Sequence, residues 1–572
     1  MWKYLKFRLR RRSRRLRQNM RLWRLWLLHY LQRHIYGSWQ KLGQLRWPFL
    51  VWILIILISF IGLINTINGY DNIYLADAPA HGGNYIEGMV GSGEVINPIY
   101  AQSTTEQDLE TLIFAGLTRQ SPKNQPEADL AKNWEISSDR KTYTFNLRDG
   151  LVWQDGQPLT AEDVAFTVDV IQDPNSKSPL ANDWKGVRYE VVGPQTIRFT
   201  LPNTFSNFLY NTTVGIIPKH LLSSVKRSNL RLHEFSQNPV GSGPYQFDGK
   251  SSDGKTIKLK AFGRYHFGRP YIESFRYRLY ETTDDMISGY AKSEIQGMGK
   301  VDAQSLDKLR SIGGLNLYQL KQPAYVAVFF NTSRAPYNNP ELRRAITQAT
   351  NRGEIIGDTL QGTASQQTVP LDATMADQPQ GIGLDTATAK ASIAKLGAGQ
   401  QTLRLTTVRG GSYEQVARSL QRQWQDAGLK IDLDLRNADD FGSSVLRSRN
   451  YDMVLYGQNV SSGDVYSFWH SSQAEDPGLN LSEYKNTDAD RAIEAARLSQ
   501  DLDYKKQKYS VFVAQWSKDA PAVVLYSPFY YYAQSKQIHG FDLHQITKPS
   551  ERFYDVQLWY IKAIKQLRAV VQ

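Results

Sequence analysis

The chain has 572 residues, which is too many for one compact core. Its residues are 41% apolar and 12% aromatic, a composition that excludes a disordered chain. Its lack of cysteine excludes disulfides, thiolate metal sites, a cysteine nucleophile and a lipidated N-terminal cysteine. The net charge of +13 arises in residues 1–46, which hold 14 Lys or Arg and no acid. The rest of the chain therefore carries a net charge of −1 (13 − 14), which excludes a basic nucleic-acid face there.

An uncharged apolar segment follows this basic region. Residues 47–70 contain no charged side chain, with Trp47 and Trp52 near one end and Tyr70 at the other. About 20 helical residues cross the hydrocarbon core of a bilayer, and aromatic residues favour its two interfaces. We therefore expect a transmembrane helix over 47–67.

The basic head at 1–46 is expected to stay cytoplasmic, because positive charge marks the inner side of a membrane. The chain would then be a single-pass protein of the cell membrane, with a linker at 68–83 and its main domain outside. Within the head, 21–40 reads as an amphipathic helix on the inner membrane surface or as a solvated basic helix. A cleaved signal peptide, ending near Ala76 or Ala78, is the alternative, but the head and the apolar run are both long for one.

The region after the linker mixes strand and helix periodicities. The clearest elements are an alternating strand at 141–150, helices at 160–174 and 339–356, and a helix followed by a strand at 414–436. Thr160 and Asn339 are the expected N-caps, and Gly428 is the expected C-cap of the third helix. This mixture predicts an α/β fold.

The sequence "GKSSDGKT" at 249–256 matches the pattern of a phosphate-binding loop. Such a loop needs a helix after it, whereas Ile257, Leu259 and Ala261 alternate with lysines as in a strand. Glycine, serine and aspartate between two strands are typical of a hairpin. We therefore predict a hairpin tip and no nucleotide site.

Other catalytic patterns are absent or attributable to chance. The sequence has no G-x-S-x-G and no H-E-x-x-H, and its Ser-x-x-Lys matches at Ser138 and Ser223 are not followed by the K-T-G of serine acyl-enzymes. No spacing of acids marks an acid/base pair. We expect no enzyme activity, no catalytic residue, no metal and no cofactor.

Eight short segments follow one another along the rest of the chain. They are "IFAGLTRQ" (113–120), the block 128–171, "GIIPKHLL" (215–222), "NPVGSGPYQF" (238–247), "LRRAITQATNRGEII" (342–356), "YDMVLYG" (451–457), "DAPAVVLY" (519–526) and "HGFDL" (539–543). In this order they resemble the extracytoplasmic solute-binding proteins of peptide-type ABC transporters, the oligopeptide- and dipeptide-binding family 5.

The resemblance implies a two-lobed periplasmic-binding-protein fold of the large, three-subdomain type. The implied parts are lobe I at 84–118, 238–325 and 520–565, an extra subdomain at 119–237, and lobe II at 326–519. It also implies a monomer that captures an oligopeptide between its lobes. The ligand would pass to an ABC permease driven by ATPase subunits on other chains.

Members of the family clamp the peptide amine with a carboxylate in one loop, which resembles "GQNVSSGDVYSF" (457–468) here. In this chain Gln458 replaces the usual tryptophan, and Ser461 stands where the usual aspartate would be. Asp464 is the acid that remains. Either Asp464 binds the peptide amine in place of the missing aspartate, or the ligand is a molecule other than a peptide with a free amine.

The resemblance also suggests which residues line the cleft. We expect Tyr325, Phe329, Asn331, Tyr456, Gln458, Ser461, Asp464, Trp469 and His470 there. Alternating aromatic residues are equally suited to a core, and the Ser-Ser-Gly run to a solvated turn. The leading function is thus a membrane-anchored peptide receptor of an ABC importer. The alternatives are a surface sensor or adhesion protein on the same fold and a binder of a non-peptide solute.

Overall fold

The computed structural model describes residues 50–63, 75–91, 95–122, 125–205, 207–377, 380–460, 464–499 and 501–567. The chain forms two compact units. One comprises residues 1–78 with 563–572, and its described part is a helix over 50–63 together with most of a two-stranded sheet of β1 (Leu75–Ala80) and β21 (Lys562–Leu567). The other comprises residues 79–562 and contains the remaining sheets.

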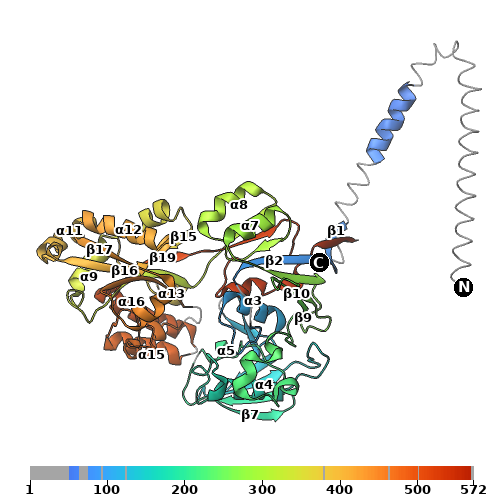
Figure 1. Cartoon of the computed structure of the whole chain (residues 1–572), viewed down its shortest axis with the longest axis horizontal. Helices are drawn as coiled ribbons and strands as arrows, with labels where there is room; N and C mark the ends of the chain where they lie inside the picture. The colour runs from blue at the N-terminus through green and yellow to red at the C-terminus, as the bar shows by residue number, and fades with distance from the viewer. Residues whose placement is uncertain are drawn as a thin grey trace, which may run out of the picture. The chain divides into compact units, whose positions relative to one another are not determined.

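The first large sheet of this second unit has seven strands. In spatial order they are β13 (Leu315–Leu320), β20 (Tyr530–Ser535), β12 (Gly297–Met298), β2 (Asn84–Val90), β11 (Ser274–Tyr280), β10 (Thr256–Ala261) and β9 (Tyr245–Lys250). Side chains of β20 alternate between two cores: Tyr532 packs toward α3 (Thr104–Ile113), whereas Tyr531 packs toward α7 (Thr283–Ala291) and α8 (Leu306–Ile312). Figure 1 shows α7 and α8 on the opposite side of β2 from α3.

A smaller antiparallel sheet belongs to the segment 119–237. Its order is β5 (Ala131–Ile136), β6 (Thr142–Leu147), β8 (Thr196–Thr200) and β7 (Arg188–Gly193). Tyr143, Phe145 and Leu147 are buried as the alternation predicts. The neighbouring helix α4 (Ala161–Gln172) begins after Thr160, whose backbone N–H donates to Asp163 at 2.9 Å. We call this sheet, with the seven-stranded one, the first lobe, because their side chains share one core.

The second lobe is built on a six-stranded sheet. Its order is β15 (Ala364–Gln366), β19 (Ala522–Pro528), β14 (Ala324–Phe330), β18 (Met453–Asn459), β16 (Thr402–Val408) and β17 (Lys430–Arg436). One face is covered by α9 (Pro340–Gln348), α11 (Thr386–Lys395) and α12 (Gly411–Asp426), and the other by α15 (Thr487–Leu498) and α16 (Leu502–Asp519). Both faces of β14 are therefore buried.

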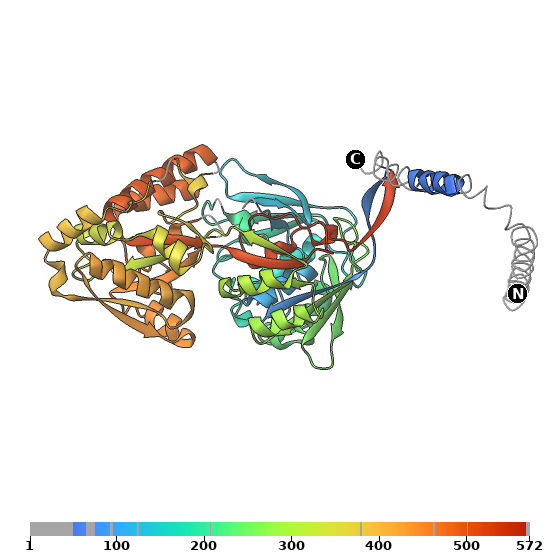
Figure 2. The same cartoon turned by 90° about the horizontal axis from the view of Figure 1, so that it is seen from above.

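The chain passes between the lobes through two adjacent strand pairs. β13 continues into β14 through residues 321–323, and β19 continues into β20 through Phe529. In Figure 2 these two passages lie side by side. The sequence prediction placed 520–565 in lobe I, whereas β19 pairs with β14 in the second sheet, so the return passage follows Pro528. The other lobe boundaries stay predictions.

Several local predictions are confirmed. β9 and β10 pair antiparallel, and "GKSSDGKT" forms their turn, with Gly249 and Gly254 at positive φ. Asn339 accepts from the Glu341 backbone N–H at 2.9 Å as the N-cap of α9. The helix predicted over 339–356 is not continuous, however, since α9 ends at Gln348 and helical structure resumes at Arg352.

Among the described residues, no helix is both long and apolar enough to cross a membrane. The described helix covers 50–63, and the other residues of the span predicted at 47–67 lie outside the described part of the chain. The predicted head at 1–46 lies outside it as well, as do Ser461 and the first part of the linker.

A fully buried charge cluster joins the N- and C-terminal parts of the first lobe. Arg552, from the 3-10 helix η11 (Pro549–Phe553), donates to Asp108 of α3 at 2.8 and 2.6 Å and to Glu87 of β2 at 3.0 Å. All three side chains are 0% exposed. The hydroxyl of Tyr85 donates to Glu87 at 2.6 Å, and that of Tyr277 donates to Asp108. Burial raises the pKa of Glu87, and the charge of Arg552 opposes that shift.

We expect Arg552→Met to lower the free energy of unfolding by about 3–5 kcal/mol, because it leaves two buried carboxylates without their cation. Urea denaturation followed by tryptophan fluorescence measures this loss. The matched control is Arg269→Met, whose ion pair with Glu273 is about half exposed and should contribute less than about 1 kcal/mol. Equal effects of the two substitutions would show that the cluster does not hold the lobe.

Candidate functional site

A pocket of about 650 Å³ lies between the two lobes. We call it the interlobe pocket, and it is lined by Pro122, Gln125, Pro126, Trp134, Asn207, Leu209, Tyr210, Lys321, Gln322, Pro323, Asp372, Thr374, Met375, Leu502, Lys505, Lys506, Tyr509, Gln545, Ile546 and Thr547. These residues come from the segment 119–237, from the passage at 321–323, from the second lobe and from the C-terminal segment at 545–547. The pocket is within the size range of small-molecule sites.

The inter-sheet passage at 321–323 forms one wall of the pocket. The Lys321 backbone N–H donates to His544 O at 3.0 Å, and Lys321 O accepts from the Ile546 N–H at 2.9 Å. The hydroxyl of Ser527, near the end of β19, donates to Gln322 O at 3.1 Å. These bonds tie the first passage to the C-terminal segment and to β19, so this wall is a fixed element of the pocket.

The N-terminal turns of α16 form the wall on the second lobe. Leu502, Lys505, Lys506 and Tyr509 follow helical spacing and face the pocket together. Asp501 caps the helix by accepting from two backbone N–H groups. Lysines near a helix N-terminus add to the positive end of the helix dipole, so this wall favours an anionic group.

The charge of the lining is unbalanced. Three lysines, Lys321, Lys505 and Lys506, face one acid, Asp372, which leaves +2 (3 − 1). The Asp372 carboxylate already accepts from the Thr374 backbone N–H at 2.8 Å and from its hydroxyl at 2.6 Å. Burial lowers the pKa of Lys505, and the charge of Asp464 opposes that shift.

The opposite wall is aromatic and belongs to the first lobe. Trp134, Leu209 and Tyr210 line it. Burial raises the pKa of Tyr210 to about 12, with the charge of Glu551 adding to the shift, so its hydroxyl stays protonated at neutral pH. A ligand in the pocket thus meets aromatic groups on one side and ammonium groups on the other.

Most of the cleft residues predicted from sequence lie in the core of the second lobe. Tyr325 donates from its hydroxyl to Gln458 Oε1 at 2.6 Å and accepts from Trp469 Nε1 at 3.1 Å. Phe329 packs on Trp469 with a ring distance of 6.0 Å. None of these residues lines the interlobe pocket. Their role in binding stays a prediction.

Asn331 and Tyr456 also make contacts within the second lobe. The Asn331 amide donates to Glu483 Oε1 at 3.1 Å. Tyr456 stacks between Tyr413 and Phe441 at ring distances of 6.0 and 5.6 Å. Neither residue lines the interlobe pocket.

Asp464, the acid that remains in the predicted amine-binding loop, is buried and paired. Its carboxylate lies 3.0 Å from Arg497 Nε and accepts from the Tyr466 backbone N–H at 3.0 Å. The Arg497 guanidinium lies over the rings of Tyr466 at 4.2 Å and of Phe205 at 4.8 Å. Because Phe205 belongs to the segment 119–237, Arg497 bridges the two lobes. A ligand amine at Asp464 would share the carboxylate with this cation.

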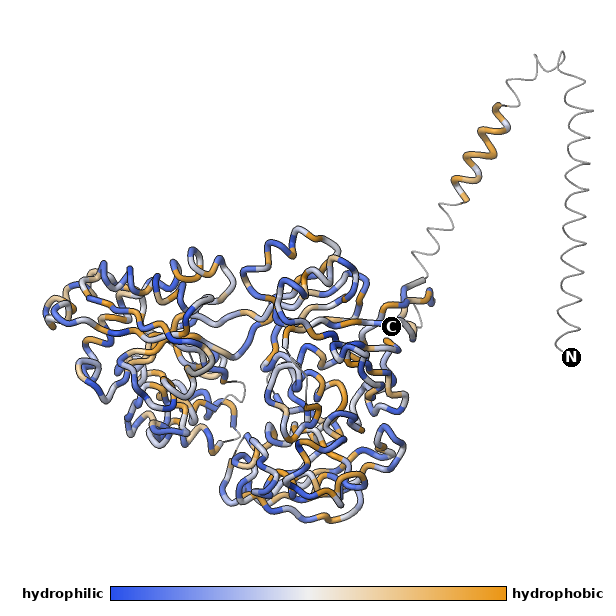
Figure 3. The backbone as a smooth tube through the Cα atoms, in the orientation of Figure 1, coloured by the Kyte–Doolittle hydropathy of each residue, from blue (hydrophilic) through white to orange (hydrophobic). Residues whose placement is uncertain are grey.

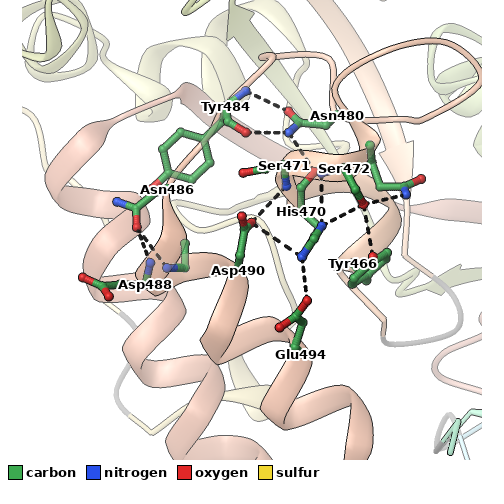
Figure 4. A network of polar contacts seen from close by, with 12 residues as sticks. Tyr466, His470, Ser471, Ser472, Asn480, Tyr484, Asn486, Asp488, Asp490 and Glu494 are labelled. Atoms are coloured by element: carbon green, nitrogen blue, oxygen red, sulfur yellow. Dashed lines mark hydrogen bonds and ion pairs between the residues drawn. The ribbon is translucent and has the colours of Figure 1, made fainter. Parts of the chain in front are cut away.

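His470, which follows that loop in the sequence, is held in a polar network (Figure 4). Its ring stacks on Tyr466 at 4.1 Å, and Nε2 lies 3.1 Å from Glu494 of α15. Ser471 donates its backbone N–H to Asp490, also on α15, at 2.9 Å. The network fixes the segment after Asp464 to α15 and does not line the interlobe pocket. Within the described chain, no group of His, Asp and Glu could hold a metal ion.

Sequence reasoning did not identify the lysines and tyrosine of α16. Their only local signal is that Leu502, Lys505, Lys506 and Tyr509 share one helical face. That pattern is common on solvated helices, and only the approach of the first lobe turns the face into a pocket wall.

Comparison with known proteins identifies relatives over most of the chain. A family model described as "Bacterial extracellular solute-binding proteins, family 5 Middle" matches residues 125–480. The oligopeptide-binding protein AppA of Bacillus subtilis is 25% identical over 523 residues, which cover 85% of this chain and 93% of AppA.

Solved structures share the fold. The B. subtilis AppA structure, in complex with a nonapeptide, has a TM-score of 0.69 at 24% identity and covers 85% of this chain and 100% of its own. The ABC transporter substrate binding protein CtaP from Listeria monocytogenes has a TM-score of 0.76 at 27% identity and covers 84% and 100%. NikZ from Campylobacter jejuni, in complex with Ni(L-His), has a TM-score of 0.70 at 21% identity and covers 83% and 99%. The expected two-lobed α/β fold is confirmed. The solved structures of this fold contain more than one kind of ligand, a nonapeptide in AppA and Ni(L-His) in NikZ.

We expect Tyr325→Phe to lower the free energy of unfolding by about 1–3 kcal/mol, because it leaves Gln458 Oε1 and Trp469 N–H buried without their partner. If the ligand binds in the interlobe pocket, its affinity should not change, because Tyr325 does not line that pocket. Urea denaturation and calorimetric titration measure the two quantities. Tyr504→Phe, at an exposed tyrosine of α16, is the control for stability. A weaker ligand affinity at unchanged stability would instead place Tyr325 in the binding site.

Proposed function

Because the chain belongs to family 5 of the bacterial extracellular solute-binding proteins, we propose that it is the peptide-binding receptor of an ABC importer. The observation that carries this proposal is the interlobe pocket, whose walls come from both lobes and meet at two adjacent strand passages. A solute in such a pocket is enclosed when the lobes rotate about those passages. Such a receptor binds and releases its ligand without chemistry.

The charge of the pocket favours a peptide with an exposed carboxylate. Lys505 and Lys506 extend from one wall and Lys321 from another, so a carboxylate between them would interact with ammonium groups of both. Trp134 and Tyr210 offer aromatic surface for the apolar part of the peptide. Acidic peptides should therefore bind more tightly than basic ones.

Delivery to a permease is part of the proposal. The only phosphate-loop pattern that we identified in the sequence is the β9–β10 hairpin, so energy for import would come from ATPase subunits on other chains. The receptor would release its peptide to the permease as a monomer.

We further propose that the N-terminal region anchors the receptor in the cell membrane. Every described apolar side chain from Leu50 to Leu63 whose exposure is given is at least 41% exposed. Figure 3 shows this helix as a mostly hydrophobic segment. The 14 cations of residues 1–46 would hold the N-terminus in the cytoplasm, which leaves the main domain outside. Tethering would raise the concentration of the receptor near its permease.

We expect the acidic tetrapeptide Ala-Ala-Glu-Glu to bind the full chain and to raise its Tm, with Ala-Ala-Lys-Lys binding more weakly. A ligand at 100 times its Kd adds about 2.7 kcal/mol of stability. Lys505→Gln and Lys506→Gln should each raise the Kd of the acidic peptide by about three- to tenfold, as expected for a lost charge-assisted hydrogen bond at a partly buried site. Calorimetric titration and thermal melts measure both effects.

Lys518→Gln, near the C-terminal end of α16, is the matched control, since it changes the same charge outside the pocket. If neither these nor other short peptides bind, the ligand is not a peptide. If peptides bind but both lysine variants bind as well as the unchanged chain, the peptide carboxylate is held elsewhere.

The full chain should sediment with membranes and resist carbonate extraction. Replacing Leu57 and Ile58 by arginine should release it, because each arginine costs about 2.5–3.5 kcal/mol at the centre of a membrane helix. The control replaces two exposed leucines of the other unit, Leu232 and Leu384, by arginine. Retention of the Leu57 and Ile58 variant in the membrane fraction would contradict the anchor.

A further inference from the structure

A second pocket, of about 350 Å³, lies in the first lobe. We call it the basic pocket, and it is lined by Leu130, Lys132, Arg148, Asp149, Gly150, Leu151, Val152, Ser242, Arg264 and His266. It shares no lining residue with the interlobe pocket. Its walls come from the start of β5, the turn after β6, the "GSGPY" segment before β9 and the loop after β10.

Cations dominate this lining. Lys132, Arg148 and Arg264 face one acid, Asp149, which leaves +2 (3 − 1). Lys132 Nζ is 3.6 Å from Asp149, whose side chain is 79% exposed, so this pair is weak. His266 Nε2 is 2.6 Å from Asp129 Oδ1, so these two side chains are hydrogen-bonded to each other.

The two arginines differ in their partners. Arg148 donates from Nε to Asp129 O at 2.6 Å and lies over Phe267 at 4.9 Å, which holds it in place. Arg264 makes no ion pair or hydrogen bond with another residue that the structure describes. Among the described residues, the Arg264 guanidinium is thus the cation of the pocket that has neither an ion pair nor a hydrogen bond.

Ser242 adds a buried hydroxyl to the same wall. The residue is 3% exposed, and its Oγ has no hydrogen-bond partner among the described residues. A buried hydroxyl without a partner costs free energy, so such groups are normally satisfied.

The backbone around Ser242 cannot turn this hydroxyl elsewhere cheaply. The Gly241 N–H donates to Gln154 Oε1 at 2.9 Å, and the Gly243 N–H donates to Ile113 O at 2.8 Å. A Cβ on Gly241 would lie 1.9 Å from Ile113 O, so the segment passes Ile113 at a distance that only glycine permits. The two glycines therefore fix Ser242 against the pocket.

We propose that the basic pocket binds a small anionic solute through an oxyanion group, either a carboxylate or a phosphate. Arg264 and Lys132 supply the charge, and the Ser242 hydroxyl donates a hydrogen bond to an anion oxygen. Leu130, Leu151 and Val152 line the rest of the pocket and contact a short apolar part of the solute. This site is separate from the proposed peptide site and does not depend on it.

The test uses calorimetric titration of the full chain at low ionic strength with two probes, inorganic phosphate and propanoate. We expect at least one of them to bind with 1:1 stoichiometry, and the comparison distinguishes a phosphate from a carboxylate site. Arg264→Gln should weaken this binding about tenfold or more, as for a lost charge-assisted hydrogen bond. The control is Lys250→Gln, which removes an exposed charge of β9 outside the pocket and should leave the affinity unchanged.

Ser242→Ala separates binding from structure. It should weaken anion binding without lowering Tm, because the hydroxyl makes no bond within the protein. Binding of Ala-Ala-Glu-Glu in the interlobe pocket should be unchanged in both pocket variants. The proposal is overturned if neither probe binds at millimolar concentration, or if Arg264→Gln and Ser242→Ala bind the anion as tightly as the unchanged chain.

Discussion

The first lobe depends on the pairing of one buried guanidinium with two buried carboxylates. Arg552 lies 465 residues along the chain from Glu87 and 444 from Asp108, yet all three meet in one fully buried cluster. Each charge is tolerable there only because the others neutralise it and tyrosine hydroxyls fill the remaining hydrogen-bond positions. The lobe is therefore complete only after the chain has built the second lobe and returned through β20.

The passage of the chain back into the first lobe also determines where the interlobe pocket lies. The passage at 321–323 is tied to the C-terminal segment by backbone hydrogen bonds between Lys321 and both His544 and Ile546, so its first-lobe end is fixed. The aromatic wall around Tyr210 and the lysines of α16 then face each other across the passages. Arg497, paired with Asp464 and lying over Phe205, is a direct contact between the lobes. The walls of the interlobe pocket thus come from both lobes.

The candidate site shows the limit of pattern reasoning. Residues 324–330 form the strand β14, and the alternation of side chains along a strand does not tell a cleft face from a core face. Tyr325 and Phe329 were expected in the cleft, and the structure packs them under α15 and α16. The pairing of Tyr325 with Gln458 becomes visible only in the register of β14 against β18. The lysines of α16 carry no local signal that separates them from an ordinary solvated face.

The sequence by itself determined the local elements and the family. Caps at Thr160 and Asn339, the turn at Gly428 and the hairpin over 249–256 follow from interactions within a few residues, and eight ordered segments identify the relatives. Only the tertiary structure decided that β19 belongs to the second sheet, that the helix after Asn339 is interrupted, and which side chains line the two pockets. Strand pairing, core burial and pocket walls arise from contacts between residues far apart in the chain, and spacing along the sequence does not specify those contacts.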